Sequence, residues 1–200
     1  MMRCKKSRRA VQSINTADKC PKFFENKIYQ THECPNIITR SQWGARQVAS
    51  VNYLIVPIPY VVIHHTAGHT CNRTSQCAEV VAGIQAQHMD SNNWGDIGYS
   101  FLIGGDGNVY EGKGWTREGA HVVGYNKKSI GIAFMGSFED NNANQTMLDV
   151  AHKLIVCGKA QGTLRPTVRV VGARQLIATV SPGFALYNQI QAWPEWVSTP

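Results

Sequence analysis

Short apolar runs alternate with amphipathic stretches along most of the chain. The runs that predict strands lie at 60–64, 99–103, 109–112, 130–136 and 168–172. The second and third flank the GGDGN turn at 104–108 and predict a hairpin. Because these runs are mostly apolar throughout, they indicate a sheet that is covered on both faces. The pattern therefore predicts an α/β fold, with a central mixed β-sheet flanked by about three helices.

Three amphipathic stretches predict the helices between these strands. They cover about 75–89, about 147–160 and the residues from Ser181 onward. The side chains expected on their core faces are Val81, Ile84 and His88, then Val150, Leu154 and Cys157, then Leu186 and Ile190. The expected N-terminal caps are Thr74 or Ser75, a Thr146…Asp149 capping box, and Ser181 followed by Pro182.

The net charge of +7 is concentrated near the amino terminus. Residues 1–27 hold eight Lys and Arg against two acidic residues, whereas residues 28–200 hold twelve basic residues against eleven acidic ones. A nucleic-acid-binding domain carries its cations on the folded body, so we expect no nucleic-acid partner. We expect residues 1–32 to be a flexible basic extension and residues 33–200 to form one domain.

No membrane span is expected from the sequence. The most apolar stretch, LIVPIPYVVI at 54–63, is too short to cross a bilayer and is interrupted by Pro57 and Pro59. After MMRCKKSRRA at the amino terminus, no apolar run typical of a secretory signal follows.

The cysteines predict disulfides and therefore an oxidising compartment. They lie at positions 4, 20, 34, 71, 77 and 157, an even number without the CxxC pair of a zinc finger. Cys71 and Cys77 are close enough in sequence to bridge around a turn. The sequons at Asn72 and Asn144 are compatible with passage through a secretory pathway and with a glycoprotein.

The stretch VVIHHTAG at 61–68 places two imidazoles, His64 and His65, at the end of a strand. His64 could be one of the three protein ligands of a catalytic zinc, with the other two on segments that return to the same sheet edge. Alternatively, the two histidines line a binding groove or form a hydrogen-bonded structural pair. The residues alone leave these interpretations open.

Five sequence blocks resemble the peptidoglycan recognition proteins, relatives of the bacteriophage-type zinc N-acetylmuramoyl-L-alanine amidases. The blocks are VVIHHTAG, DIGYSFLIGGDGNVYEGKGW (96–115), GAHVVGYN (119–126), SIGIAFMGSF (129–138) and SPGFALYNQIQAWPEW (181–196). The resemblance runs from about Cys34 to Pro200. It implies an α/β fold with a groove for the glycan and stem peptide of peptidoglycan, and disulfides Cys34–Cys157 and Cys71–Cys77.

The same resemblance implies that the metal site is lost. Catalytic relatives hold zinc with the first His of the HHT block, a His in a GHR-type block and a Cys in a CPG-type block. Here these positions are His64, Ala173 and Ser181. Alanine cannot coordinate a metal, and a neutral hydroxyl substitutes poorly for a thiolate. We therefore expect no cofactor, no amidase activity, a vestigial His64, and no metal-bound water for Tyr99 to assist at the position of the catalytic tyrosine.

The resemblance also assigns the residues that contact a muropeptide. They are His65, Thr66, His88, Asn92, Asn93, Trp94, Tyr99, Lys113, His121 and Asn126. Amide, imidazole and aromatic groups suit a ligand that presents amides, carboxylates and a sugar face. Asn93-Trp94 together with Lys113 mixes the patterns of relatives that bind lysine-type and diaminopimelate-type stem peptides. It slightly favours diaminopimelate, because Lys113 can pair with the extra carboxylate.

We interpret the chain as a secreted innate-immune pattern recognition receptor that binds peptidoglycan without hydrolysing it. The resemblance implies a downstream protein partner and a Toll-type cascade. Two enzymatic alternatives are a residual N-acetylmuramoyl-L-alanine amidase and a hydrolase that uses Ser181 with a nearby histidine. A third alternative is a bactericidal protein whose basic residues 1–27 act on anionic envelopes.

Overall fold

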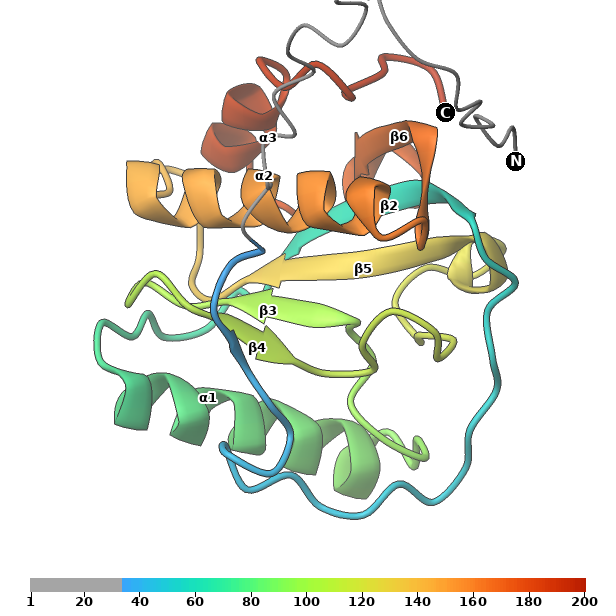
Figure 1. Cartoon of the computed structure of the whole chain (residues 1–200). Helices are drawn as coiled ribbons and strands as arrows, with labels where there is room; N and C mark the ends of the chain where they lie inside the picture. Colours follow the sequence, from blue (N-terminus) through green and yellow to red (C-terminus); the bar gives the residue numbers. More distant parts are fainter. Residues whose placement is uncertain (1–33) are drawn as a thin grey trace, which may run out of the picture. The chain divides into compact units, whose positions relative to one another are not determined.

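A six-stranded sheet runs through residues 34–200, the part of the chain that the computed structural model describes (Figure 1). Its strands are β1 (Ile37–Ile38), β2 (Ile58–His65), β3 (Phe101–Ile103), β4 (Val109–Glu111), β5 (Ser129–Phe134) and β6 (Leu164–Gly172). They lie in the order β1-β4-β3-β5-β2-β6, and all neighbours are parallel except β3 and β4, which form the expected hairpin. The mixed sheet is therefore confirmed. The expected extension 1–32, with Cys4 and Cys20, lies outside the described residues.

The strand bounds differ from expectation, by one or two residues for β2, β3 and β5 and by more at the sheet edges. The two-residue strand β1 was not predicted, because so short a segment carries no periodicity. At the opposite edge, β6 begins at Leu164 rather than at residue 168, and the three residues after Leu164 are all exposed. An edge strand needs fewer apolar residues than a central one, so the apolar pattern detected only its buried second half.

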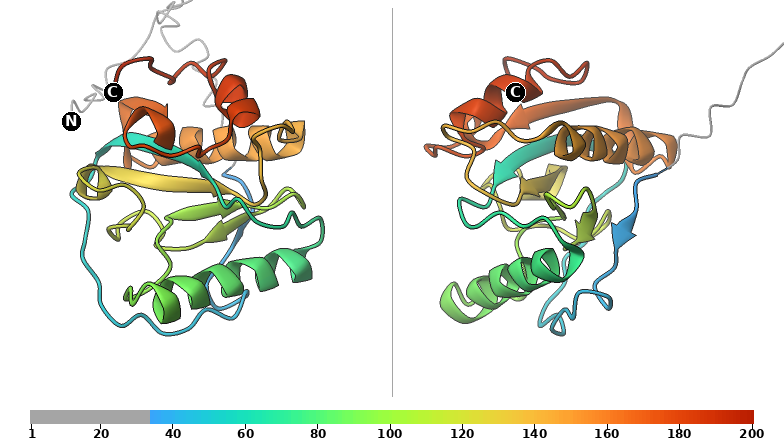
Figure 2. Two further views of the ribbon diagram at one scale, coloured as in Figure 1. Left: turned by 180° about the vertical axis from the view of Figure 1, so that it is seen from behind. Right: turned by 90° about the vertical axis from the view of Figure 1, so that its left-hand side faces the viewer.

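β2 lies in the interior of the sheet, between β5 and β6. Val61 is paired in register with Ile130 of β5 and with Val170 of β6, and all three are buried. The helices form layers on the two faces of the sheet, with α1 on one side and α2 and α3 on the other (Figures 1 and 2). This arrangement confirms the prediction of a sheet covered on both faces.

The helices are α1 (Thr74–Ala86), α2 (Gln145–Ala160) and α3 (Phe184–Ile190), with short turns η1 (Gln87–Ser91, π), η2 (Asn126–Lys128, 3-10) and η3 (Ala173–Gln175, 3-10). The expected core residues of α2 and α3 are buried. In α1 the buried residues are Cys77, Val81 and Gln85, whereas Ile84 and His88 remain partly exposed. The predicted core face of α1 was therefore only partly correct.

The predicted helix caps were wrong. Arg73 precedes α1 without a side-chain cap, although Thr74 or Ser75 was expected to provide one. The cap of α2 is Asn144, whose Oδ1 accepts a hydrogen bond from Met147 N–H at 2.8 Å. The cap of α3 is Gly183, and both Ser181 and Pro182 lie before the helix.

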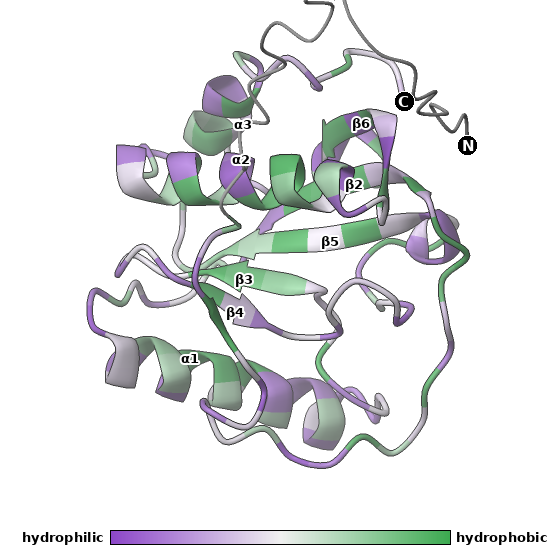
Figure 3. Ribbon diagram, in the orientation of Figure 1, coloured by the Kyte–Doolittle hydropathy of each residue, from purple (hydrophilic) through white to green (hydrophobic). Residues whose placement is uncertain are grey.

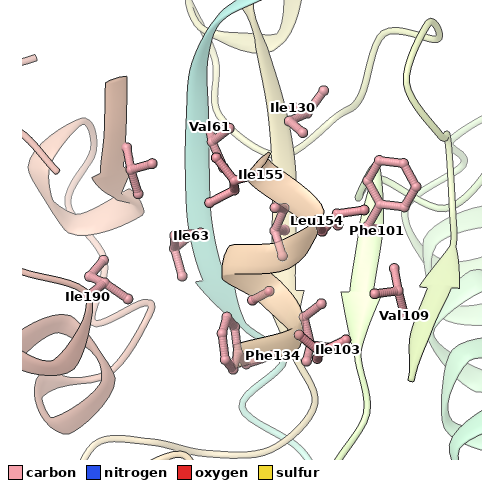
Figure 4. Close-up of a cluster of buried hydrophobic side chains, with 14 of the residues drawn as sticks. Val61, Ile63, Phe101, Ile103, Val109, Ile130, Phe134, Leu154, Ile155 and Ile190 are labelled. Carbon is pink, nitrogen blue, oxygen red and sulfur yellow. The ribbon is translucent and has the colours of Figure 1, made fainter. Parts of the chain in front are cut away.

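Hydrophobic cores fill both sides of the sheet. On one side Leu154 of α2 packs with Val61 and Ile130 (Figure 4), and on the other Val81 of α1 packs with Leu102. Figure 3 shows mainly apolar strands and helices that carry both apolar and polar residues. Within residues 34–200, no helix has both the length and the apolar character needed to cross a membrane.

Two disulfides reinforce this architecture, and both were expected. Cys34 is bonded to Cys157 in α2, with their Cα atoms 5.1 Å apart. Cys71 is bonded to Cys77 in the first turns of α1, with a Cα separation of 5.2 Å. The first bridge spans most of the described chain and the second fixes the start of a helix that lacks a side-chain cap.

Replacing Asn144 with alanine is expected to lower the free energy of unfolding by about 0.5–2 kcal/mol, because Met147 N–H loses its acceptor. Thr146→Ala is the matched control, since this residue lies in the first turn of the same helix and was the wrongly predicted cap. Urea unfolding of protein produced without glycosylation measures both changes. A larger loss for Thr146→Ala than for Asn144→Ala would contradict the assignment of the cap.

Candidate functional site

The two histidines of the HHT block end the interior strand β2. Both residues are buried, with 4% of His64 and 5% of His65 exposed. Successive side chains of a strand point to opposite faces. His64 accordingly contacts His121 and Tyr99, whereas His65 Nδ1 accepts a hydrogen bond from Phe138 N–H at 3.2 Å. The sequence therefore correctly predicted two histidines at the end of a strand, but their imidazoles lie on opposite faces of the sheet and have different neighbours.

His64 and His121 form a hydrogen-bonded imidazole pair. His64 Nε2 lies 3.1 Å from His121 Nδ1, and the rings meet edge to face at a centroid distance of 5.1 Å. Burial lowers the pKa of His64 well below its usual value, and it lowers the pKa of His121 to about 4. At neutral pH both rings are therefore uncharged, and one nitrogen donates while the other accepts.

Aromatic rings continue outward from His64. Tyr99 lies 5.3 Å from His64 and 5.6 Å from His88 between ring centroids, and His88 lies 4.8 Å from Trp94. His88 Nδ1 accepts a hydrogen bond from Gly98 N–H at 3.0 Å, which fixes the ring. Burial raises the pKa of Tyr99 and lowers that of His88, so the phenol and the imidazole are both neutral at pH 7.

The loop after η1 presents polar groups beside these rings. Asn92 and Asn93 are exposed, and Trp94 exposes 38% of its surface. Asn93 has a φ of 56°, a left-handed conformation that asparagine tolerates better than most residues. Backbone hydrogen bonds from Asn92 to Gln87 and from Trp94 to His88 hold the loop against the helix end.

Two predicted contact residues hold backbone segments in place. The Asn126 Oδ1 accepts hydrogen bonds from His121 N–H and Val122 N–H, both at 2.9 Å. Thr66 Oγ1 accepts one from Gly136 N–H at 3.0 Å. These side chains therefore shape the loops around the histidines, a role that the sequence pattern did not reveal.

Lys113 lies in a buried cluster of charges. It is only 8% exposed, and its Nζ lies 3.8 Å from Asp96 Oδ2. The other carboxylate oxygen, Oδ1, accepts hydrogen bonds from Gln85 at 2.7 Å and from Arg40 at 3.1 Å. Burial lowers the pKa of Lys113, and the nearby Asp96 carboxylate opposes that shift.

This cluster was not predicted from the sequence. Asp96 is the first residue of the DIGYS block, and Arg40 precedes it by 56 residues. Gln85 is a polar residue on the buried face of α1, and that unusual position was the available signal. Asp96 Oδ2 makes no hydrogen bond within residues 34–200, so Lys113 compensates its charge through space.

The positions that resemble metal ligands carry other contacts. Ala173 is fully buried and offers no ligand atom. Ser181 Oγ accepts a hydrogen bond from His65 N–H at 3.1 Å, which ties the segment before α3 to the end of β2. Throughout residues 34–200, no three His, Cys, Asp or Glu side chains gather as metal ligands would. The arrangement does not fit a zinc ion.

Known proteins resemble this chain in both fold and sequence. A family model described as N-acetylmuramoyl-L-alanine amidase matches residues 52–184. Peptidoglycan-recognition protein SA of Drosophila melanogaster is 45% identical over 167 residues, which cover 84% of this chain and 82% of that protein. The X-ray structure of bumblebee PGRP-SA is 59% identical with a TM-score of 0.82, and the match covers 84% of this chain and 100% of that one.

A third match is the ectodomain complex of PGRP-LCa and PGRP-LCx with bound tracheal cytotoxin. It is 43% identical with a TM-score of 0.80, covering 81% of this chain and 98% of that one. The chain belongs to the N-acetylmuramoyl-L-alanine amidase family and, within it, to the peptidoglycan-recognition proteins. The family resemblance noted in the sequence is confirmed.

The imidazole of His121 is expected to titrate with a pKa of about 4 in the folded protein. Because this value lies below the usual one, the unfolded chain binds more protons, and the contribution of this ring to stability decreases as the pH falls from about 6.5 toward 4. Nitrogen-detected NMR follows the ring during titration, with the urea-unfolded chain as control. A His121 resonance that titrates near 6.5 in the folded protein would contradict the lowered pKa.

Proposed function

We propose that this protein is an extracellular receptor that binds the muramyl stem peptide of bacterial peptidoglycan without hydrolysing it. Its relatives are named peptidoglycan-recognition proteins, and one structural neighbour was solved with bound tracheal cytotoxin. The two disulfides favour an oxidising, extracellular environment.

The absence of hydrolysis is proposed from the three positions that match the zinc ligands of catalytic relatives. His64 is engaged with His121, Ala173 has only a buried methyl group, and Ser181 accepts a hydrogen bond from the protein backbone. One imidazole alone does not make a zinc site. A serine hydrolase needs a base beside its hydroxyl. The Ser181 Oγ instead accepts a hydrogen bond from the main-chain N–H of His65.

The proposed contact residues are those that the family resemblance assigns. They are His65, Thr66, His88, Asn92, Asn93, Trp94, Tyr99, Lys113, His121 and Asn126. The exposed members, Asn92, Asn93 and Trp94, are suited to direct contact with sugar and peptide groups. Asn126 and Thr66 act mainly by fixing the loops that carry the other groups.

Lys113 is the proposed determinant of stem-peptide preference. Its ammonium is already paired through space with Asp96, so a ligand carboxylate must compete with that buried charge. The competition weakens the advantage of the extra carboxylate of diaminopimelate without removing it. We therefore propose a modest preference for diaminopimelate-type peptidoglycan.

A receptor without catalysis needs a second protein to produce a response. We propose that ligand binding is passed to a downstream protein partner and to a Toll-type proteolytic cascade. The relatives on which this rests include peptidoglycan-recognition protein SA. Replacing the peptidoglycan-binding residues is expected to abolish both peptidoglycan binding and activation of the cascade.

Trp94→Ala is expected to weaken binding to insoluble peptidoglycan by about tenfold, because an exposed aromatic wall is lost. Phe184→Ala, which removes an exposed aromatic side chain from α3, is the matched control. Sedimentation with purified peptidoglycan and with cellulose measures binding. Wild-type protein that sediments equally with both polymers would refute the binding function.

Chelation of metal by EDTA is expected to leave peptidoglycan binding unchanged and to reveal no zinc-dependent release of stem peptides. The physical reason is the lack of a three-ligand set at His64, Ala173 and Ser181. Sedimentation measures retention, and mass spectrometry of the supernatant measures cleavage. Stoichiometric zinc in the purified protein, or stem peptides released only without EDTA, would instead favour the residual amidase.

Lys113→Met is expected to weaken binding of a soluble diaminopimelate-type muropeptide by about tenfold, which corresponds to about 1.4 kcal/mol. Binding of the lysine-type muropeptide should change much less, because that ligand lacks the second carboxylate. Lys127→Met removes an exposed lysine and is the control. Calorimetry gives both affinities, and an equal loss for the two ligands would contradict the proposed role.

A further inference from the structure

Three exposed cations lie just before β5 and along the edge strand β6. Lys128 of η2 and Arg165 and Arg169 of β6 are exposed, and none of them forms an ion pair within residues 34–200. By contrast, the cations Arg40, Arg46, Lys113, Arg117 and Lys159 are all paired with carboxylates. These three are among seven cations of residues 34–200 that form no ion pair; the other four are Arg73, Lys127, Lys153 and Arg174.

Two tyrosines contact two of these cations, Lys128 and Arg169. Lys128 Nζ lies 3.9 Å from the ring centroid of Tyr125, and Arg169 donates a hydrogen bond to Tyr60 Oη at 3.2 Å. The two rings meet edge to face at 5.4 Å. We call Tyr60, Tyr125, Lys128, Arg165 and Arg169 the basic patch. Because Lys128 and Arg169 rest on aromatic rings, these two side chains lose less freedom when an anion binds.

An exposed apolar strip adjoins the basic patch. Tyr53, Ile55 and Val56 expose 75%, 88% and 45% of their surfaces. Arg165 Nε donates a hydrogen bond to the carbonyl oxygen of Pro57, the next residue after the strip, which links the two features.

The strip is held in place by a neighbouring segment. Leu54 is buried, and its N–H donates to Thr116 O at 2.8 Å; Tyr53 forms a β-bridge with Arg117. Its apolar side chains are therefore presented to solvent by an anchored backbone. Exposed apolar groups that are anchored beside a polar rim are typical of protein interaction sites.

We propose that the basic patch and the apolar strip together form a docking surface for an acidic segment of another protein that also carries apolar side chains. This inference rests on the proposed function, because it assigns a surface to the partner of a non-catalytic receptor. Charge complementarity selects acidic residues, and the strip selects apolar ones.

Two other occupants fit the surface less well. A polyanion such as a phosphate-rich polymer would neutralise the cations but would leave the apolar strip uncovered. The protein's own amino-terminal residues 1–27 carry eight basic residues against two acidic ones, so they would be repelled by the basic patch. A foreign segment with both acidic and apolar residues matches both parts of the surface.

The test uses the full chain and a short synthetic peptide in which Asp and Glu alternate with Leu and Phe. Calorimetry is expected to show binding that weakens with added salt. Lys128→Glu/Arg169→Glu and, separately, Ile55→Asp should each reduce the affinity at least about tenfold. Arg73→Glu/Lys153→Glu makes the same change in net charge at exposed positions outside the patch and should leave the affinity within about twofold.

Several results would overturn the inference. Polyglutamate that binds as tightly as the mixed peptide would identify a general polyanion site. Circular dichroism checks that the patch variants are folded. If the folded variants bind the peptide with unchanged affinity, the peptide binds at another surface.

Sedimentation with peptidoglycan distinguishes the two proposals. The patch variants should still bind peptidoglycan, and loss of that binding would assign the patch to the ligand site instead. Failure of the wild-type protein to sediment would refute the proposed receptor function, while the peptide measurements would still decide whether the surface binds acidic apolar segments.

Discussion

The double pairing of β2 is the constraint on which the rest of the structure depends. Hydrogen-bond ladders to β5 and β6 fix its register from both sides, and helices cover both faces. A slip of one residue would exchange the faces of His64 and His65. It would separate His64 from His121 and remove Phe138 from His65. The geometry of the candidate site is therefore a consequence of strand register more than of local loop conformation.

Neutral and charged groups occupy different parts of the site. The imidazoles of His64 and His121 lose charge because burial penalises it, and they satisfy one another by hydrogen bonding. The buried charges of the site are Asp96, which is held by Arg40, and Lys113, which faces it. Uncharged groups that both donate and accept suit amides and sugars, whereas the charged cluster suits a carboxylate. This division is consistent with recognition of a glycopeptide.

The sequence predicted the features that depend on apolar pattern and missed those that depend on long-range contact. The central strands and the core face of α2 were evident, because burial on both faces leaves a strong signal. The apolar run of β2 also correctly predicted that His64 and His65 lie at the end of a strand. The partner of His64 lies 57 residues away and could not be inferred. Caps also failed, because Asn144 and Thr146 are both acceptable capping residues by composition, and only backbone geometry decides between them.

The bond between Cys34 and Cys157 has a consequence for the integrity of the molecule. Its sequence separation of 123 residues encloses most of the folded chain in one covalent ring. A single proteolytic cut anywhere inside that ring opens the ring but releases no fragment, so the strands on either side of the cut remain tethered and can stay paired. The covalent ring therefore confines the effect of one cut to the segment around it.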